Sequence, residues 1–330
     1  MKRASTLAFM LLNLAYLAAQ SVYGEQPLAH TYSIVAYDSL TGNMGVAVQS
    51  HWFSVGTAVI WGEAGVGVVA TQSFTNPAFG PDGLALLKNG KTAQEAVDEL
   101  ISADEGRDFR QLGIVDSKGN AASYTGAKCI DAAGYQLGGG YATQANMMEN
   151  DRVWSAMAKA FEAARGQDLA ERLVAALEAA QSAGGDIRGR QSAALLVVSA
   201  QNTGKPWVDR IVDLRVEDHP TPVVELKRLL KTHKAYSYMN QGDLQLEAGD
   251  VEAAMQSYGA AGKLFPENLE MKFWTAVSLA NSGKVSASLP LFADIFKKDK
   301  NWVELLKRLP KSGLLTVSEA DKQRILETQK

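Results

Sequence analysis

Two polar segments of the sequence carry side chains that could do chemistry. The first runs from Gln49 to Gly56 and places Ser50 and His51 at the end of one apolar run, just before another begins. A hydroxyl group and an imidazole that titrates near neutral pH suit nucleophilic or acid–base catalysis. Neighbouring residues on a strand point to opposite faces of a sheet, so a direct Ser50–His51 pair is not expected. The alternative for His51 is a structural or solvated role.

The second segment runs from Gly184 to Ser192 and groups Asp186, Arg188 and Arg190 among three glycines. Glycine lets the backbone approach a ligand closely, and guanidinium groups offer forked donors to a carboxylate. The pattern predicts a loop that binds an anionic part of a substrate. The alternative is an ion pair between Asp186 and one of the arginines that holds the loop in place.

Other familiar chemical signatures are absent from the sequence. There is no nucleophile elbow, no phosphate-binding loop and no paired-cysteine metal site, and the four histidines are not spaced as ligands. We therefore expect no metal and no cofactor. Cys129 is the only cysteine and is expected to be a buried thiol without a catalytic role. With 33 basic and 36 acidic residues, the chain has no excess positive charge for a nucleic-acid partner.

Elements that could position these residues are visible in the local patterns. Short β-rich runs separated by glycine turns over residues 31–71 predict an antiparallel meander, and Gly138–Gly140 is expected to be a flexible turn. The later elements are expected at the following residues: helices at 80–103 (divided by Gly90), 151–164 and 168–183, and strands at 111–116, 120–125, 193–200 and 208–216. This order predicts an α+β domain in which helices cover antiparallel sheet.

Beyond Pro220 the sequence becomes helical and contains a repeat. Residues at the spacings of a tetratricopeptide repeat are Gly242, Ala254, Tyr258, Ala261 and Pro266. A second, degenerate copy would place Ala276, Ser288, Phe292 and Ile295 at equivalent positions. Small residues let two helices approach, while aromatic residues fill the gap to the next repeat. We expect an all-α domain that binds a protein or peptide partner; the alternative is a generic helical tail.

The first 24 residues have the order of a cleavable signal peptide, with Lys2 and Arg3 ahead of an apolar stretch from Leu7 to Ala19. Asn13 interrupts that stretch, which is shorter than the roughly 20 apolar residues of a spanning helix. We expect cleavage near Gly24, export to the periplasm or the extracellular space, and no membrane span after cleavage.

Several motifs of the first part of the chain point to one family. They are Thr31–Ala36, Gly45–Ser50, Gly65–Gly67, Ala70–Gln72 and, the most specific, Ala183–Ala194. Together they resemble the domain-of-unknown-function family numbered 1028 over about Thr31 to Val216. The resemblance implies a four-layer αββα sandwich like that of N-terminal-nucleophile hydrolases. The domains are then expected at 1–24 (signal peptide), 30–217 (αββα domain), 218–234 (linker helix) and 235–330 (tetratricopeptide-like domain).

The same resemblance implies a mechanism. In the wider superfamily a Thr, Ser or Cys at the first mature position attacks an amide carbonyl, and Thr31 matches that position. The residue's own α-amine can accept the hydroxyl proton, provided that the amine is free. Cleavage after Gly24 would leave residues 25–30 attached and the nitrogen of Thr31 inside a peptide bond. The mechanism therefore requires a chain that begins at Thr31.

The site implied by the resemblance joins both polar segments. Its residues are Thr31 as nucleophile, His51 as proton shuttle, Gln72 and Asn76 as oxyanion donors, and Ser50, Asp186, Arg188 and Arg190 as substrate-binding residues. We expect an exported hydrolase that acts on the C–N amide bond of a small metabolite or peptide. The alternative is a non-catalytic exported binding or scaffold protein that uses a degenerate hydrolase fold and the helical repeats.

Overall fold

The structure, a computed structural model, describes residues 28–329. The expected signal peptide at 1–24 lies outside these residues. The chain divides into two compact units between Leu230 and Lys231. Because each unit has its own core, each is described by itself.

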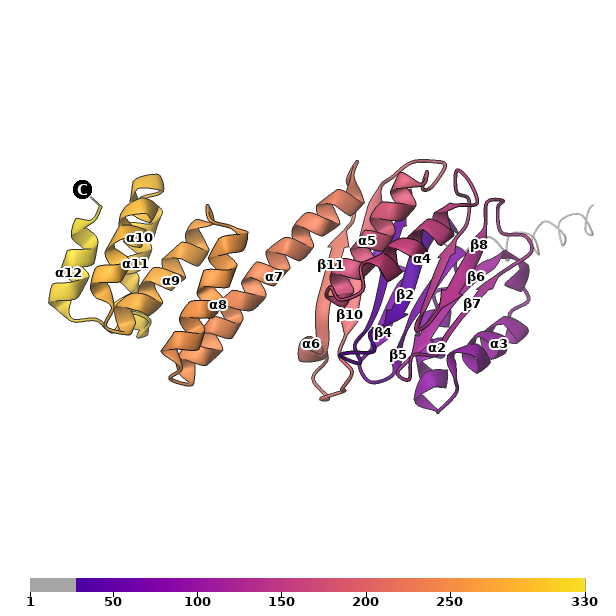
Figure 1. The fold of residues 1–330 in the computed structure, drawn as a ribbon, viewed down its shortest axis with the longest axis horizontal. Helices are drawn as coiled ribbons and strands as arrows, with labels where there is room; N and C mark the ends of the chain where they lie inside the picture. The colour runs from indigo at the N-terminus through magenta and orange to yellow at the C-terminus, as the bar shows by residue number, and fades with distance from the viewer. Residues whose placement is uncertain (1–27, 330) are drawn as a thin grey trace, which may run out of the picture. The chain divides into compact units, whose positions relative to one another are not determined.

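In the described part of the first unit, one sheet has six antiparallel strands (Figure 1). Their order across the sheet is β11 (Arg210–Val216), β10 (Ser192–Val198), β3 (Met44–Ser50), β2 (Thr31–Tyr37), β9 (Tyr141–Ala145) and β8 (Gly134–Gly138). β3 and β10 are buried along their whole length, because each has a neighbouring strand on both edges. The expected antiparallel sheet is confirmed.

A second sheet within the described residues has five antiparallel strands. The order is β1 (Leu28–Ala29), β5 (Gly67–Phe74), β6 (Arg110–Asp116) and β7 (Ala121–Thr125), with β4 (Ile60–Glu63) also pairing with β5. The expected meander over residues 31–71 is therefore wrong. β2 and β10 occupy both edges of β3, so the chain leaves this sheet through a 3-10 turn at Val55–Thr57 and enters the other.

Periodicity located the helices better than the strands. The helices are α2 (Phe79–Lys88), α3 (Ala93–Ala103), α4 (Val153–Ala163) and α5 (Leu169–Ser182), close to the expected ranges. A capping box formed by Thr92 and Glu95 starts α3. Strands β8 and β9 were not expected, because only the glycine turn between them, at Gly139–Gly140, was recognised.

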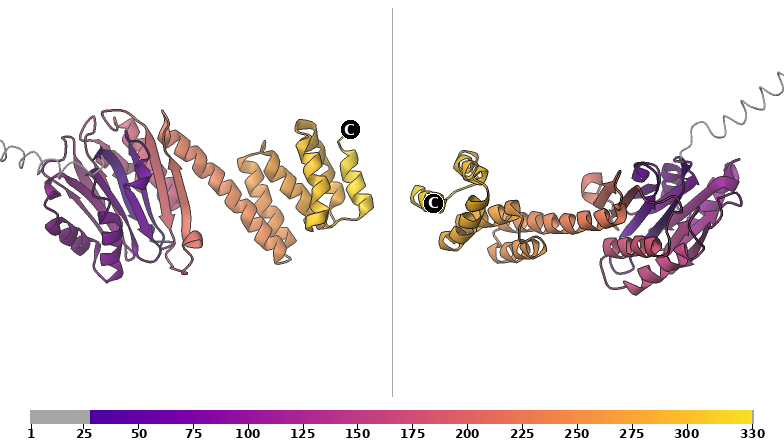
Figure 2. Two further views of the ribbon diagram at one scale, coloured as in Figure 1. Left: turned by 180° about the vertical axis from the view of Figure 1, so that it is seen from behind. Right: turned by 90° about the horizontal axis from the view of Figure 1, so that it is seen from above.

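Three apolar clusters hold the first unit together. One contains Val35 and Val48 from the six-stranded sheet with Val68 and Val115 from the other, so the two sheets pack against each other (Figure 2). A second joins the opposite face of the six-stranded sheet to α4 and α5, and a third joins the five-stranded sheet to α2 and α3. Apolar burial of this kind contributes about 25 cal/mol per Å².

The second unit is helical. Its helices are the C-terminal part of α7 (Pro222–Glu247), α8 (Val251–Leu264), α9 (Leu269–Asn281), α10 (Val285–Lys298), α11 (Asn301–Arg308) and α12 (Glu319–Glu327). α7 continues through residue 234, the expected boundary between a linker helix and the repeat, and has no Gly or Pro from residue 223 to 241. Ala254, Tyr258 and Ala261 are buried in one cluster, and Phe292 and Ile295 in another.

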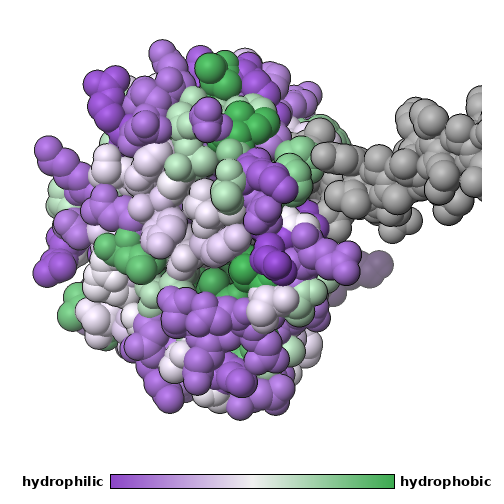
Figure 3. Space-filling view, turned by 90° about the vertical axis from the view of Figure 1, so that its right-hand side faces the viewer, coloured by the Kyte–Doolittle hydropathy of each residue, from purple (hydrophilic) through white to green (hydrophobic). Residues whose placement is uncertain are grey.

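Two surface properties complete the description. In the face shown in Figure 3, apolar side chains form small separate patches among polar ones, the usual condition of a protein surface. Within residues 28–329, no helix is both long and apolar enough to span a bilayer.

Candidate functional site

The register of the six-stranded sheet brings the candidate residues to one edge. Thr31, at the start of β2, pairs with Ser50, at the end of β3, and Ser50 pairs in turn with Ser192, at the start of β10. Because neighbouring strands run in opposite directions, the start of one lies beside the end of the next. The loop of residues 184–191, which leads into β10, therefore arrives next to Thr31.

At this edge, the peptide bond before Thr31 has a carbonyl group held by two side chains. The carbonyl oxygen of His30 accepts hydrogen bonds from Oγ of Ser50, at 2.6 Å, and from Nη2 of Arg188, at 2.8 Å. One donor carries a positive charge, and charge-assisted hydrogen bonds are the stronger kind. The pair resembles an oxyanion hole, in which donors point at an oxygen that gains negative charge.

Asp186 fixes the position of Arg188. Its buried carboxylate accepts from Nε of Arg188 at 3.0 Å and from Nη2 at 2.7 Å, as well as from the backbone nitrogens of Arg188 and His51. Gly189, which has a φ of +118°, lets the chain turn directly after this pair. The ion pair expected as an alternative is present, and the same arginine also reaches the His30 carbonyl.

The side chain of His30 is buried beside the site. Its Nδ1 lies 2.8 Å from Oδ1 of Asn146, and its ring meets Phe74 edge-on with 5.6 Å between centroids. Burial lowers the pKa of His30, and the nearby Arg188 acts in the same direction, although the hydrogen bond to Asn146 opposes both. The imidazole is therefore held in its neutral form more strongly than in the unfolded chain.

Thr31 is fully buried in this structure. Its Oγ1 donates to the carbonyl oxygen of Ala29 at 2.6 Å, and its own carbonyl oxygen accepts from Nε2 of Gln72 at 3.1 Å. The second hydrogen bond of Gln72 Nε2, at 2.6 Å, goes to Oε1 of Gln111. Gln72 therefore donates to the backbone carbonyl of Thr31 and not to the carbonyl of His30, which the expected oxyanion role would require.

Behind Thr31, amide side chains from both sheets form a connected polar network. Gln111 is its centre, accepting from Gln72 and Asn146 and donating to Thr125 and the Ala145 carbonyl. Buried polar groups of this kind destabilise the fold unless they are paired. The hydrogen bonds of the network therefore favour one position of the two sheets relative to each other.

Three of the predicted residues lie apart from the Thr31 hydroxyl. The imidazole of His51 is exposed beside Gly189, and only the backbone nitrogen of His51 bonds to Asp186. Oδ1 of Asn76 accepts from the backbone nitrogen of Ala78, just before α2. Arg190 is exposed and forms no hydrogen bond or ion pair with any residue in the range 28–329. The structure shows no contact between these side chains and Thr31.

Sequence reasoning missed His30, Gln111 and Asn146. It also missed Gln144, whose Nε2 donates to Oγ of Ser33, which in turn donates to Gln72. The available signal was a glutamine within or beside an otherwise apolar strand, since Gln72, Gln111 and Gln144 are all fully buried. Several residues with a strained backbone conformation also lie near the site. Of the non-glycine residues with positive φ in the described chain, Ser54, Ser73 and Met147 each lie within a few positions of a site residue.

A surface cavity of about 730 Å³ adjoins the site and is lined by Gln181, Asp186, Arg188 and Arg190 among others. A substrate could reach the arginines from there. No group of three or more His, Cys, Asp or Glu side chains that could hold a metal occurs among residues 28–329. The thiol of Cys129 is buried, which raises its pKa, and donates to the Arg110 carbonyl.

Fold and site together define a mixed α/β protein with antiparallel sheets, a buried polar site at one sheet edge and a helical C-terminal region. The chain belongs to the Family of unknown function (DUF1028), which matches residues 31–226. A crystal structure of a protein of this family from Silicibacter pomeroyi is similar, with 33% identity, a TM-score of 0.55 and coverage of 61% of this chain and 88% of that one.

A more distant structure is Anbu (ancestral beta-subunit) from Yersinia bercovieri, at 12% identity and covering 60% of this chain and 92% of that one. Its TM-score of 0.30 carries no argument about fold or function. No curated protein matches the chain.

Proposed function

We propose that this protein is an exported amide hydrolase of the N-terminal-nucleophile type, with Thr31 as the nucleophile. The observation that carries the proposal is the pair of donors, Ser50 and Arg188, on the carbonyl oxygen directly before Thr31. Removing one such donor in other hydrolases costs about 10²- to 10³-fold in rate. In this assignment Ser50 and Arg188 take the role first expected of Gln72 and Asn76.

The site first acts on its own chain. Oγ1 of Thr31 attacks the carbonyl carbon of His30, the acyl group moves from nitrogen to oxygen, and water hydrolyses the resulting ester. The products are a carboxylate on His30 and a free α-amine on Thr31. That amine then serves as the base for the hydroxyl in each later reaction.

A substrate would occupy the position left by residues 28–30. β1 pairs with β5 through Leu28↔Phe74 and Ala29↔Ser73, so the acyl side of a peptide could bind there as an added strand. Its carbonyl oxygen would face Ser50 and Arg188, while Arg190 could meet a carboxylate from the adjoining cavity. The substrate class is therefore a small peptide or acylated amine.

Two features of the fold support this proposal. Packing of the sheets against each other, with helices on their other faces, agrees with the four-layer αββα arrangement expected from the family resemblance. In the second unit, Gly242 lies against the ring of Tyr258, and a small residue against an aromatic ring at this spacing supports a tetratricopeptide-like repeat. We propose that these helices bind a protein or peptide partner.

The second candidate is a non-catalytic exported scaffold. It is favoured by one observation: Thr31 is fully buried. In that case the polar network only stabilises the fold. Thr31→Ala would then leave the cellular role intact.

Turnover by the chain that begins at Thr31 separates the two candidates. We expect it to hydrolyse members of a panel of dipeptides, peptide amides and N-acyl amino acids. Thr31→Ser should retain part of this activity and Thr31→Ala none, because only serine also supplies a hydroxyl group. Equal turnover by the Thr31→Ala chain would reject the hydrolase mechanism.

A further inference from the structure

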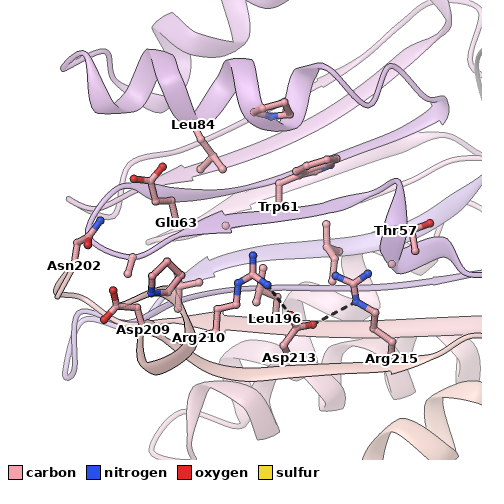
Figure 4. Close-up of a pocket in the computed structure, with 17 residues that line it drawn as sticks. Thr57, Trp61, Glu63, Leu84, Leu196, Asn202, Asp209, Arg210, Asp213 and Arg215 are labelled. Carbon is pink, nitrogen blue, oxygen red and sulfur yellow. Dashed lines mark hydrogen bonds and ion pairs between the residues drawn. The ribbon is translucent and has the colours of Figure 1, made fainter. Parts of the chain in front are cut away.

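A second cavity, of about 460 Å³, lies elsewhere in the first unit and contains none of the residues of the Thr31 site (Figure 4). It opens between β4 and the adjoining start of α2 on one side and the β10–β11 hairpin on the other. Its volume is within the range of small-molecule sites, about 300–1,000 Å³.

The cavity exists because the six-stranded sheet extends further at this edge than the five-stranded sheet that packs on it. Gly62 of β4 lies against Leu196 and Val198 of β10, and β4 is the edge strand of its sheet. β11 is the edge strand of the other sheet and lies one strand further out than β10. Asp213 and Arg215 of β11 therefore border open space instead of apolar side chains.

Three charged side chains on β11 form the floor of the cavity. The carboxylate of Asp213 lies between two guanidinium groups, 3.3 Å from Nη1 of Arg210 and 3.3 Å from Nε of Arg215. Each guanidinium has five N–H donors, and the structure assigns these two arginines no partner other than Asp213 within residues 28–329. The two guanidinium groups therefore keep several unused donors. One further negative charge at the cavity, that of the buried Asp209, is held by the neutral donors of Thr203.

The other carboxylates at the cavity already have partners. Glu63 pairs with Lys88 at 2.6 Å. Asp209 is buried and accepts from the backbone nitrogen and hydroxyl of Thr203. Neither therefore competes strongly for the two guanidinium groups.

The apolar part of the lining comes from both sides of the edge strand β4. Leu196 and Val198 of β10 line the cavity on the side of the arginines. Trp61 and Leu84 line it from the other side of β4, together with Glu63 (Figure 4). The indole of Trp61 packs on Gly80 and donates to the Ala58 carbonyl at 3.1 Å, so its position in the lining is fixed.

We propose that this cavity binds a small organic carboxylate that carries an apolar group. The carboxylate accepts forked hydrogen bonds from Arg210 and Arg215, and the apolar group lies against Leu196 and Val198. The two guanidinium groups flank only one carboxylate, so they have unused donors for a second one. A dianion such as a phosphate monoester would place more negative charge beside Asp213 and Asp209.

Titration of the full chain with phenylacetate tests the proposal, with 2-phenylethanol and phenylethylamine as neutral and cationic controls. The readout is the indole N–H signal of Trp61 in a proton–nitrogen correlation spectrum, identified with Trp61→Phe. Phenylacetate should shift this signal at millimolar concentrations, and the controls should bind at least about tenfold more weakly. No shift with phenylacetate, or equal shifts with all three, would overturn the proposal.

Three substitutions of exposed or half-buried charged side chains sharpen the test. Arg210→Gln and Arg215→Gln should each weaken phenylacetate binding by about tenfold, whereas Asp213→Asn should strengthen it because a competing carboxylate is removed. Arg228→Gln is the matched control, since it removes the same charge from an exposed ion pair with Glu225. Equal binding by the Arg210 and Arg215 variants and the control would refute anion recognition by β11.

Discussion

The carbonyl oxygen of His30 accepts a 2.8 Å hydrogen bond from Nη2 of Arg188, although the two residues are 158 positions apart in the chain. The bond joins the residue before the predicted nucleophile to the glycine-rich loop before β10. Asp186 orients the same guanidinium group from the other side. The two polar segments of the sequence are thereby parts of one site.

Arg188→Gln should slow cleavage of the His30–Thr31 bond by about 100-fold, because the charged donor to the developing oxyanion is lost. Intact-mass spectrometry of freshly purified protein over time measures the fraction that begins at Thr31. Arg190→Gln is the matched control: Arg190 is in the same loop and exposed, so its loss should leave the cleavage rate unchanged. Equal cleavage rates in the two variants would show that Arg188 takes no part in the cleavage reaction.

Stability should depend on pH through His30. Its pKa is below 6.5 in the folded chain because burial disfavours the imidazolium, so the unfolded chain binds more protons at mildly acidic pH. The free energy of unfolding should therefore fall as pH drops below about 6.5, by at most about 1.4 kcal/mol per pH unit. Urea unfolding between neutral pH and pH 5 measures this slope.

The matched comparison for His30 is His30→Gln, with both proteins carrying Thr31→Ala so that residue 30 stays attached. The glutamine variant should lose the part of the slope that His30 contributes. Identical pH profiles would show that His30 titrates alike in the folded and unfolded chains.

Local patterns predicted the helices and the polar loop but not the partners of that loop. Residues 184–190 stand out because three charged residues and three glycines lie together before an apolar strand. Their contact with His30 depends on β3 lying between β2 and β10, and strand order is set by long-range pairing. The meander prediction failed for the same reason, since it assumed that consecutive strands share a sheet.

In the second unit, two glycines should respond to alanine in opposite directions. A Cβ built at Gly242 would lie 2.5 Å from Cε1 of the buried Tyr258, so Gly242→Ala should destabilise the unit by about 1–3 kcal/mol. Gly259, in α8, has no atom within 4 Å of such a Cβ, and Gly259→Ala should stabilise by about 0.5–1 kcal/mol. Thermal unfolding measures both. Stabilisation by Gly242→Ala would contradict the close α7–α8 contact.

Ser54 stores strain next to the site, with a φ of 56° and a ψ of 42°. Ser54→Gly should stabilise the protein by about 0.5–1 kcal/mol, because glycine adopts this left-handed conformation without a steric cost. Ser54→Ala keeps the strain and should change stability by less than about 0.5 kcal/mol. Urea unfolding compares the three proteins, and destabilisation by glycine would show that the serine conformation is not strained.

The most direct measurement of the central claim is the N-terminal residue of the mature protein, determined by intact-mass and N-terminal peptide analysis. The hydrolase mechanism predicts a chain that begins at Thr31, and its disappearance in Thr31→Ala, which cannot cleave itself. A wild-type chain that retains His30, or a Thr31→Ala chain that still begins at residue 31, would contradict it.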